Sequence, residues 1–295
     1  MPLSDPPAQD AEPPEAARLP ETVSLPPSSA SEQVSRYFAQ IEEQRLSRGL
    51  LRQERAPRDL PFSARDLEEA FVRIALFEEY SFVGGRIVER ATPSSLRRWN
   101  TPVRMRLEFG DSVPPAQRSA DTAFVRNYAA RLARLTQHPV SLVGERGNFH
   151  VLVLSEDERS TIGPRLQTLV PGIDSVTLDL VRDLPLSVSC LVLAFSRSGS
   201  DHYTDAVAVI RAELPELSRR ACYYEELAQG LGLPNDDPRA RPSLFNDTAE
   251  FAVLTALDEN LLQMLYDERL RPGMRAREAR PVIREIAQEL MGGAS

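Results

Sequence analysis

The stretch from Cys222 to Asp237 reads CYYEELAQGLGLPNDD, and it carries the most specific pattern in the chain. Apolar residues at helical spacing run from Leu214 to Leu231 and predict one amphipathic helix. Gly232 and the Pro-Asn pair after it predict a sharp turn at the end of that helix. We expect the turn to bring side chains ten positions apart to face each other.

The spacing of polar residues in this stretch resembles that of a zinc protease. With Glu225 at position i, Glu226 is at i+1, Gln229 at i+4, Gly232 at i+7 and Asn235 at i+10. Metzincins use this spacing as H-E-x-x-H-x-x-G-x-x-H, where three histidines hold zinc and the glutamate activates the metal-bound water. The resemblance makes segment 214–237 similar to a metzincin zinc helix with its turn.

The residue types depart from that motif at every metal ligand. Glu225, Gln229 and Asn235 stand where the histidines would be, and this oxygen set with one charge is a poor match for zinc. We therefore expect these three degenerate positions to be free of metal and expect no cofactor, with zinc or calcium as the alternatives. Glu226 is the candidate catalytic residue. The competing interpretation is an ordinary polar helix face that ends at Gly232.

The rest of the chain predicts a mixed sheet with packed helices. Residues 102–109 alternate apolar and charged side chains as a half-buried strand does, and residues 116–137 have helical spacing. Residues 140–143 and 149–154 predict two strands, either a hairpin or neighbours, and residues 188–195 predict a nearly continuous apolar strand. Ser63 predicts the start of a helix whose exit turn is Gly84-Gly85. His202 begins a Gly-Ser-rich loop.

The final third is predicted to be helical, with helices at 214–231, 258–266 and 277–290. The fold class is therefore α+β, with a mixed sheet, packed helices and a zincin-like arrangement. Residues 1–31 are rich in proline and acidic residues and predict a disordered tail. Residues 32–295 predict one α+β domain whose C-terminal helical subdomain is 238–295.

Charge argues against a nucleic-acid partner, and hydropathy argues against a transmembrane helix. The net charge of -8 and the pI near 5.2 argue against nucleic acid, because phosphate binding needs a basic face. No apolar run approaches the roughly 18 residues that a transmembrane helix needs.

The two cysteines, Cys190 and Cys222, are compatible with a disulfide or with two buried thiols.

Five strings resemble the bacterial domain-of-unknown-function 2927 family. They begin at Leu96 (LRRWNTPV), Asn148 (NFHVLV), Glu225 (EELAQGLG), Arg241 (RPSLFND) and Leu265 (LYDERLRPGM). The similar family members carry histidine where this chain has Tyr224. Because such members are commonly exported or lipid-anchored proteins of proteobacteria, the resemblance implies an exported or periplasmic protein. A cytoplasmic location is the alternative if Met1 is the true start.

The sequence favours a non-catalytic zincin-like module that binds an unknown protein or peptide partner. The alternative is a metal-dependent hydrolase of the peptidase type, with Glu226 as general base. That alternative predicts a deep cleft beside the 214–231 helix and a raised carboxyl pKa in it. A purely structural protein would instead direct Glu225 and Glu226 into open solvent.

Overall fold

The computed structural model describes residues 28–83 and 86–292. The predicted tail lies outside these residues except for its last four, and Ser29 already begins helix α1 (Ser29–Ser47). The Gly84-Gly85 turn also lies outside the described residues.

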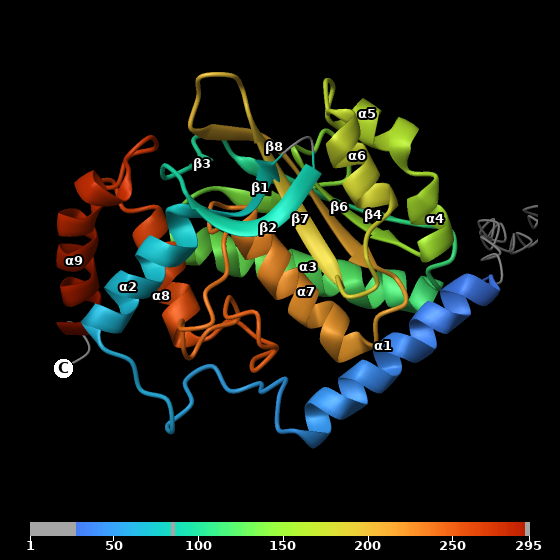
Figure 1. The fold of residues 1–295 in the computed structure, drawn as a ribbon, viewed down its shortest axis with the longest axis horizontal. Coiled ribbons are helices and arrows are strands. Elements are labelled where there is room, and N and C mark those ends of the chain that lie inside the picture. The colour runs from blue at the N-terminus through green and yellow to red at the C-terminus, as the bar shows by residue number, and fades with distance from the viewer. Residues whose placement is uncertain (1–27, 84–85, 293–295) are drawn as a thin grey trace, which may run out of the picture.

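A mixed sheet forms the centre of the domain (Figure 1). Strands β3, β8, β6, β4 and β5 lie in this order with parallel neighbours, and β7 pairs antiparallel with β8. The strands are β3 (Arg98–Trp99), β4 (Val103–Phe109), β5 (Val140–Leu142), β6 (Phe149–Leu154), β7 (Cys190–Ser196) and β8 (His202–Arg211). A separate antiparallel hairpin consists of β1 (Phe77–Val83) and β2 (Arg86–Pro93).

Helices cover both faces of the sheet. One face packs against α3 (Pro115–Thr136), α7 (Glu216–Gln229) and α8 (Ala256–Leu265), and the other packs against α5 (Gly163–Leu169) and α6 (Ser175–Arg182). Helix α4 (Glu156–Ser160) follows β6. Helices α2 (Ala64–Ala75) and α9 (Ala276–Gly292) pack on each other beside α8. The C-terminal segment is helical, as predicted.

Alternation along the strands explains the two cores. Phe149, Val151 and Val153 of β6 belong to the main core, whereas Leu152 and Leu154 belong to the smaller cluster beneath α5 and α6. Successive side chains of a strand point to opposite faces, so one apolar run serves both cores.

The α+β class and the mixed sheet are confirmed, and three local expectations are corrected. Strands β5 and β6 are not a hairpin, because β4 lies between them and is parallel to both. His202 is the first residue of β8 and does not begin a loop. The helix after Ser63 ends at Ala75, and β1 occupies the residues that follow. The helical spacing of apolar residues continues to Leu76, so the sequence pattern did not indicate the change from helix to strand.

Candidate functional site

Helix α7 ends in the sharp turn that its sequence predicts. Gly230 caps the helix, and the backbone N–H of Leu233 donates to the Gln229 carbonyl over 3.1 Å. Gly232 has a φ of +134°, and a Cβ there would lie 2.3 Å from the backbone oxygen of Arg97. Glycine is required at this position for both its conformation and its close contact with the chain before β3.

Aromatic side chains hold the turn in place. The indole Nε1 of Trp99 donates to the Gly230 carbonyl over 2.8 Å, and the Tyr266 hydroxyl donates to the Leu231 carbonyl over 3.1 Å. The backbone N–H of Asp237 donates to the Phe245 carbonyl over 3.0 Å. The turn is therefore fixed from both sides by residues distant in sequence.

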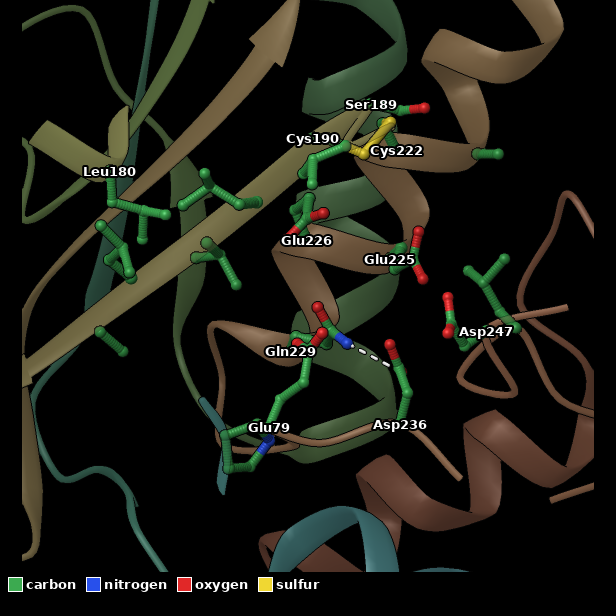
Figure 2. A pocket seen from close by; sticks show the side chains of 18 of the residues that line it. Glu79, Leu180, Ser189, Cys190, Cys222, Glu225, Glu226, Gln229, Asp236 and Asp247 are labelled. Carbon is green, nitrogen blue, oxygen red and sulfur yellow. Dashed lines mark hydrogen bonds between the residues drawn. A yellow bond between two sulfur atoms is a disulfide. The ribbon is translucent and has the colours of Figure 1, made fainter. Parts of the chain in front are cut away.

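A cavity of about 740 Å³ lies beside α7 and β7 (Figure 2). Every residue from Ser187 to Phe195 lines it, together with residues of α6 and β1 and of the loops after α1 and α7. Successive side chains of a strand point to opposite faces, so a cavity that meets all of them runs along the edge of β7. Among the described residues β7 pairs with β8 alone, which leaves its outer edge facing the cavity.

The structure brings together most of the predicted site residues. Glu225, Glu226 and Gln229 all line the cavity, and Glu226 and Gln229 are buried. Asn235 does not line it. The Asn235 side-chain amide is buried and donates instead to the carbonyls of Arg73 over 2.9 Å and Asp236 over 2.8 Å. Asp236, one residue further on, faces the cavity and accepts a 3.0 Å hydrogen bond from Gln229 Nε2 (Figure 2).

The two adjacent glutamates share the cavity although they are neighbours on a helix. Adjacent helical side chains point about 100° apart. Figure 2 shows Glu225 directed toward Asp247 and Glu226 on the side of β7. One carboxylate oxygen of each glutamate lies within 4.8 Å of the other and of Cys190 Sγ. Neither glutamate therefore belongs to a merely solvated helix face.

Acidic residues outnumber basic ones around the cavity. The acidic lining residues are Glu78, Glu79, Asp174, Glu225, Glu226, Asp236 and Asp247, against Arg45 and Arg97. Arg97 is already paired with Glu78 over 3.0 Å.

Burial raises the pKa values of four of these carboxyls, and for three of them neighbouring carboxyls raise the pKa further. Burial, and next the nearby carboxyl of Glu79, raise the pKa of Glu225 from 4.5 to about 8. Burial and the Glu225 carboxyl raise the pKa of Glu226 well above its ordinary value, and the same two causes raise the pKa of Asp236. Burial also raises the pKa of Asp247, while Arg45 lowers it. The cavity therefore favours neutral carboxyls or a cation from outside.

Cys190 and Cys222 form a disulfide that joins β7 to α7 at the wall of the cavity, with a Cα–Cα distance of 6.0 Å. The sequence was compatible with a disulfide or with two buried thiols, and the structure has the disulfide. It also links β7 to α7, the helix that carries Glu225 and Glu226.

The donors at the cavity do not fit zinc. The described residues offer Cys190, Glu225 and Glu226 as one group of metal-ligand type, and the Cys190 sulfur is bound in the disulfide. None of the three histidines lines the cavity. Two carboxylates with a neutral amide lack the imidazole or thiolate donors that zinc selects.

The sequence patterns did not select three of the acidic residues that line the cavity. Glu79 lies on β1, which the sequence assigned to a helix, and Asp247 lies in a loop far from α7. Asp236 stands one position after the expected Asn235. A one-residue offset after a turn is not visible in spacing, because the turn geometry sets which side chain faces back.

Comparisons with known proteins give one match. Residues 64–285 match the model of a family described as "Protein of unknown function (DUF2927)". The chain matches no curated protein and no solved structure. No helix in the described part of the chain is long and apolar enough to cross a membrane. The matched segment contains β1 to α8, α7 and its turn included, and the chain therefore belongs to the DUF2927 family.

Proposed function

We propose that this domain is a zincin-like binding module whose cleft takes an extended segment of a protein or peptide along β7. The observation that carries the proposal is the outer edge of β7, which pairs with no other strand among the described residues and faces the cavity from Cys190 to Phe195. Such an edge presents unpaired backbone N–H and C=O groups, and an added strand satisfies them. The cavity volume lies within the usual range for ligand sites.

The order of elements supports the zincin-like part of the proposal. Metzincins place strands and a long helix first, then an edge strand that lines the cleft, then the zinc helix and a supporting turn. Here β4, α3, the antiparallel edge strand β7, α7 and the Gly232 turn follow in that order. The likeness is one of fold, and fold alone does not assign a reaction.

The proposal is tested with a random dodecapeptide display library selected on the purified domain. The tightest peptide is then resynthesised with one N-methylated backbone nitrogen at a time. Because alternate residues of an added strand bond to the edge, N-methylation at every second position should weaken binding at least tenfold, and the positions between should tolerate it. A peptide that binds with no alternation, or a failure to select any peptide, contradicts the proposal.

A second candidate is a hydrolase with Glu226 as general base. The raised pKa of this buried carboxyl, beside a cleft deep enough for a substrate, favours it. The selected peptides are incubated with the wild-type domain and with Glu226→Gln, with EDTA or with added Zn²⁺, and analysed by mass spectrometry. Cleavage by the wild type that the variant loses would establish the hydrolase. Intact peptides under every condition favour the binding module.

We also propose that the protein is exported and held by its N-terminal tail. The Cys190–Cys222 disulfide supports export, because disulfides persist in oxidising compartments. Thiol labelling of the protein in freshly lysed cells of its native host should find neither cysteine free before reduction. Free thiols in the native protein would oppose export.

A further inference from the structure

The cavity contains a buried carboxyl that has no hydrogen-bond or ion-pair partner among the described residues. The Glu226 side chain is 4 % exposed and lines the cavity, and in the described part of the chain its carboxylate makes no hydrogen bond or ion pair. Figure 2 shows it beside the disulfide, on the side of β7. Buried carboxyls are normally paired, because removal from water is costly. The Glu226 carboxyl faces the cavity, so a group bound there can supply the partner that the protein does not.

The surroundings of Glu226 supply more acceptors than donors. An oxygen of Glu225 lies within 4.8 Å of a Glu226 oxygen, and Asp236 accepts a hydrogen bond from Gln229. Of the two arginines that line the cavity, Arg97 is paired with Glu78, and Arg45 lowers the pKa values of Glu225 and Asp247. The missing group is therefore a donor with positive charge.

We infer that Glu226 and Glu225 form a pocket for the ammonium group of a lysine side chain carried by the bound peptide. This inference rests on the proposed function, because the peptide along β7 delivers the lysine. Two carboxylate oxygens up to 4.8 Å apart can both accept hydrogen bonds of roughly 2.8 Å from one ammonium nitrogen.

Lysine fits this geometry better than the other cations. An arginine fork binds both oxygens of one carboxylate in a plane, whereas these oxygens come from two side chains that diverge on the helix. A divalent metal would find two free carboxylates in the group of His, Cys, Asp and Glu donors that the described residues bring together here, because the third member, Cys190 Sγ, is in the disulfide. A peptide N-terminus fits less well, because the cavity continues on both sides of Cys190, past residues 187–189 before β7 and past residues 191–195 within it. The peptide should therefore pass through the site and insert an internal side chain.

The inference is tested with capped heptapeptide sub-libraries that differ only at the central residue. The central residue is Lys, Arg, norleucine, Nε-acetyl-lysine or Glu, and binding to the full-length protein is measured at pH 7.5 in low salt. We expect the Lys sub-library to bind at least tenfold more tightly than norleucine, acetyl-lysine and Glu, and severalfold more tightly than Arg. Glu226→Gln should reduce the advantage of Lys over norleucine to less than threefold.

A matched variant guards against a general effect of charge. Glu216 lies exposed on the same helix, paired with Arg220 and outside the cavity, so Glu216→Gln should keep the full lysine preference. Norleucine binding should be the same in all three proteins, which shows that Glu226→Gln still folds and still holds a peptide.

The outcomes separate the two proposals. If the sub-libraries bind equally well, the lysine pocket is wrong while peptide binding stands. If none binds, peptide binding fails and the lysine pocket fails with it. Elemental analysis that finds a stoichiometric divalent metal lost in Glu226→Gln would also overturn the lysine pocket. A lysine preference that survives in Glu226→Gln would assign the selectivity to other residues.

Discussion

At the scale of single residues, Gly232 determines the direction of the chain that follows α7. Its φ of +134° is a conformation that L side chains rarely adopt, and its α-carbon faces the Arg97 carbonyl. The turn it permits places Asp236 opposite Gln229, seven positions earlier on the chain. Gly232 thus sets the position of Asp236 in the wall of the cavity.

Gly232→Ala should destabilise the domain by roughly 3 kcal/mol or more, because the new methyl group meets backbone that cannot move aside. The effect is measured as the free energy of unfolding in urea. Gly49→Ala is the control. Gly49 also has a positive φ, +72°, but nothing lies within 4 Å of a Cβ there, so about 1 kcal/mol is expected. Equal losses in the two variants would show that the contact with Arg97 is unimportant.

At the scale of elements, α7 is held between β7 and α3. The disulfide fixes it to β7, and a buried ion pair fixes it to α3, with Arg219 Nε 2.9 Å from Asp121 Oδ2. Both charged side chains are buried. The Tyr128 hydroxyl of α3 also donates to the Tyr224 carbonyl over 2.7 Å. Asp121, Arg219 and Tyr128 do not line the cavity, so the ion pair and this hydrogen bond position the glutamates without occupying it.

Asp121→Ala should lower the free energy of unfolding by about 3–5 kcal/mol, since it leaves the Arg219 guanidinium buried without its charge partner. Thermal and urea unfolding report the loss. Glu216→Ala breaks an exposed ion pair on the same helix and should cost less than about 1 kcal/mol. A small effect at Asp121 would mean that water reaches Arg219 after the substitution.

At the scale of the whole molecule, the acidic cavity makes stability depend on pH. The pKa values of Glu225, Glu226 and Asp236 are raised in the folded protein, mainly by burial. The folded state therefore binds more protons than the unfolded state above the ordinary carboxyl pKa. Stability falls as pH rises through that window, which for Glu225 runs from 4.5 to about 8.

We expect the free energy of unfolding to fall by at least roughly 2–4 kcal/mol between pH 5 and pH 8, since one such carboxyl alone contributes up to ~1.4 kcal/mol per pH unit. Urea titrations at four pH values test this. Glu226→Gln should flatten the curve and be more stable than wild type at pH 8, whereas Glu216→Gln should follow the wild type. A wild-type curve that rises over this range would contradict the assignment of neutral carboxyls to the folded cavity.

The sequence by itself determined the elements whose pattern is local. Period-2 alternation gave β4, helical spacing gave α3 and α7, and Gly232 gave the turn, because each depends on residues a few positions apart. Spacing also selected Glu225, Glu226 and Gln229, which one helix must carry together.

Only the tertiary structure decided which strands pair and which acids meet. Local patterns do not encode that β4 lies between β5 and β6, or that β7 runs antiparallel at an open edge. The same holds for Glu79 and Asp247, which reach the cavity from segments more than a hundred residues apart, and for the choice of Asp236 over Asn235. These depend on long-range packing, where burial and backbone contacts at distant residues set the direction of each side chain.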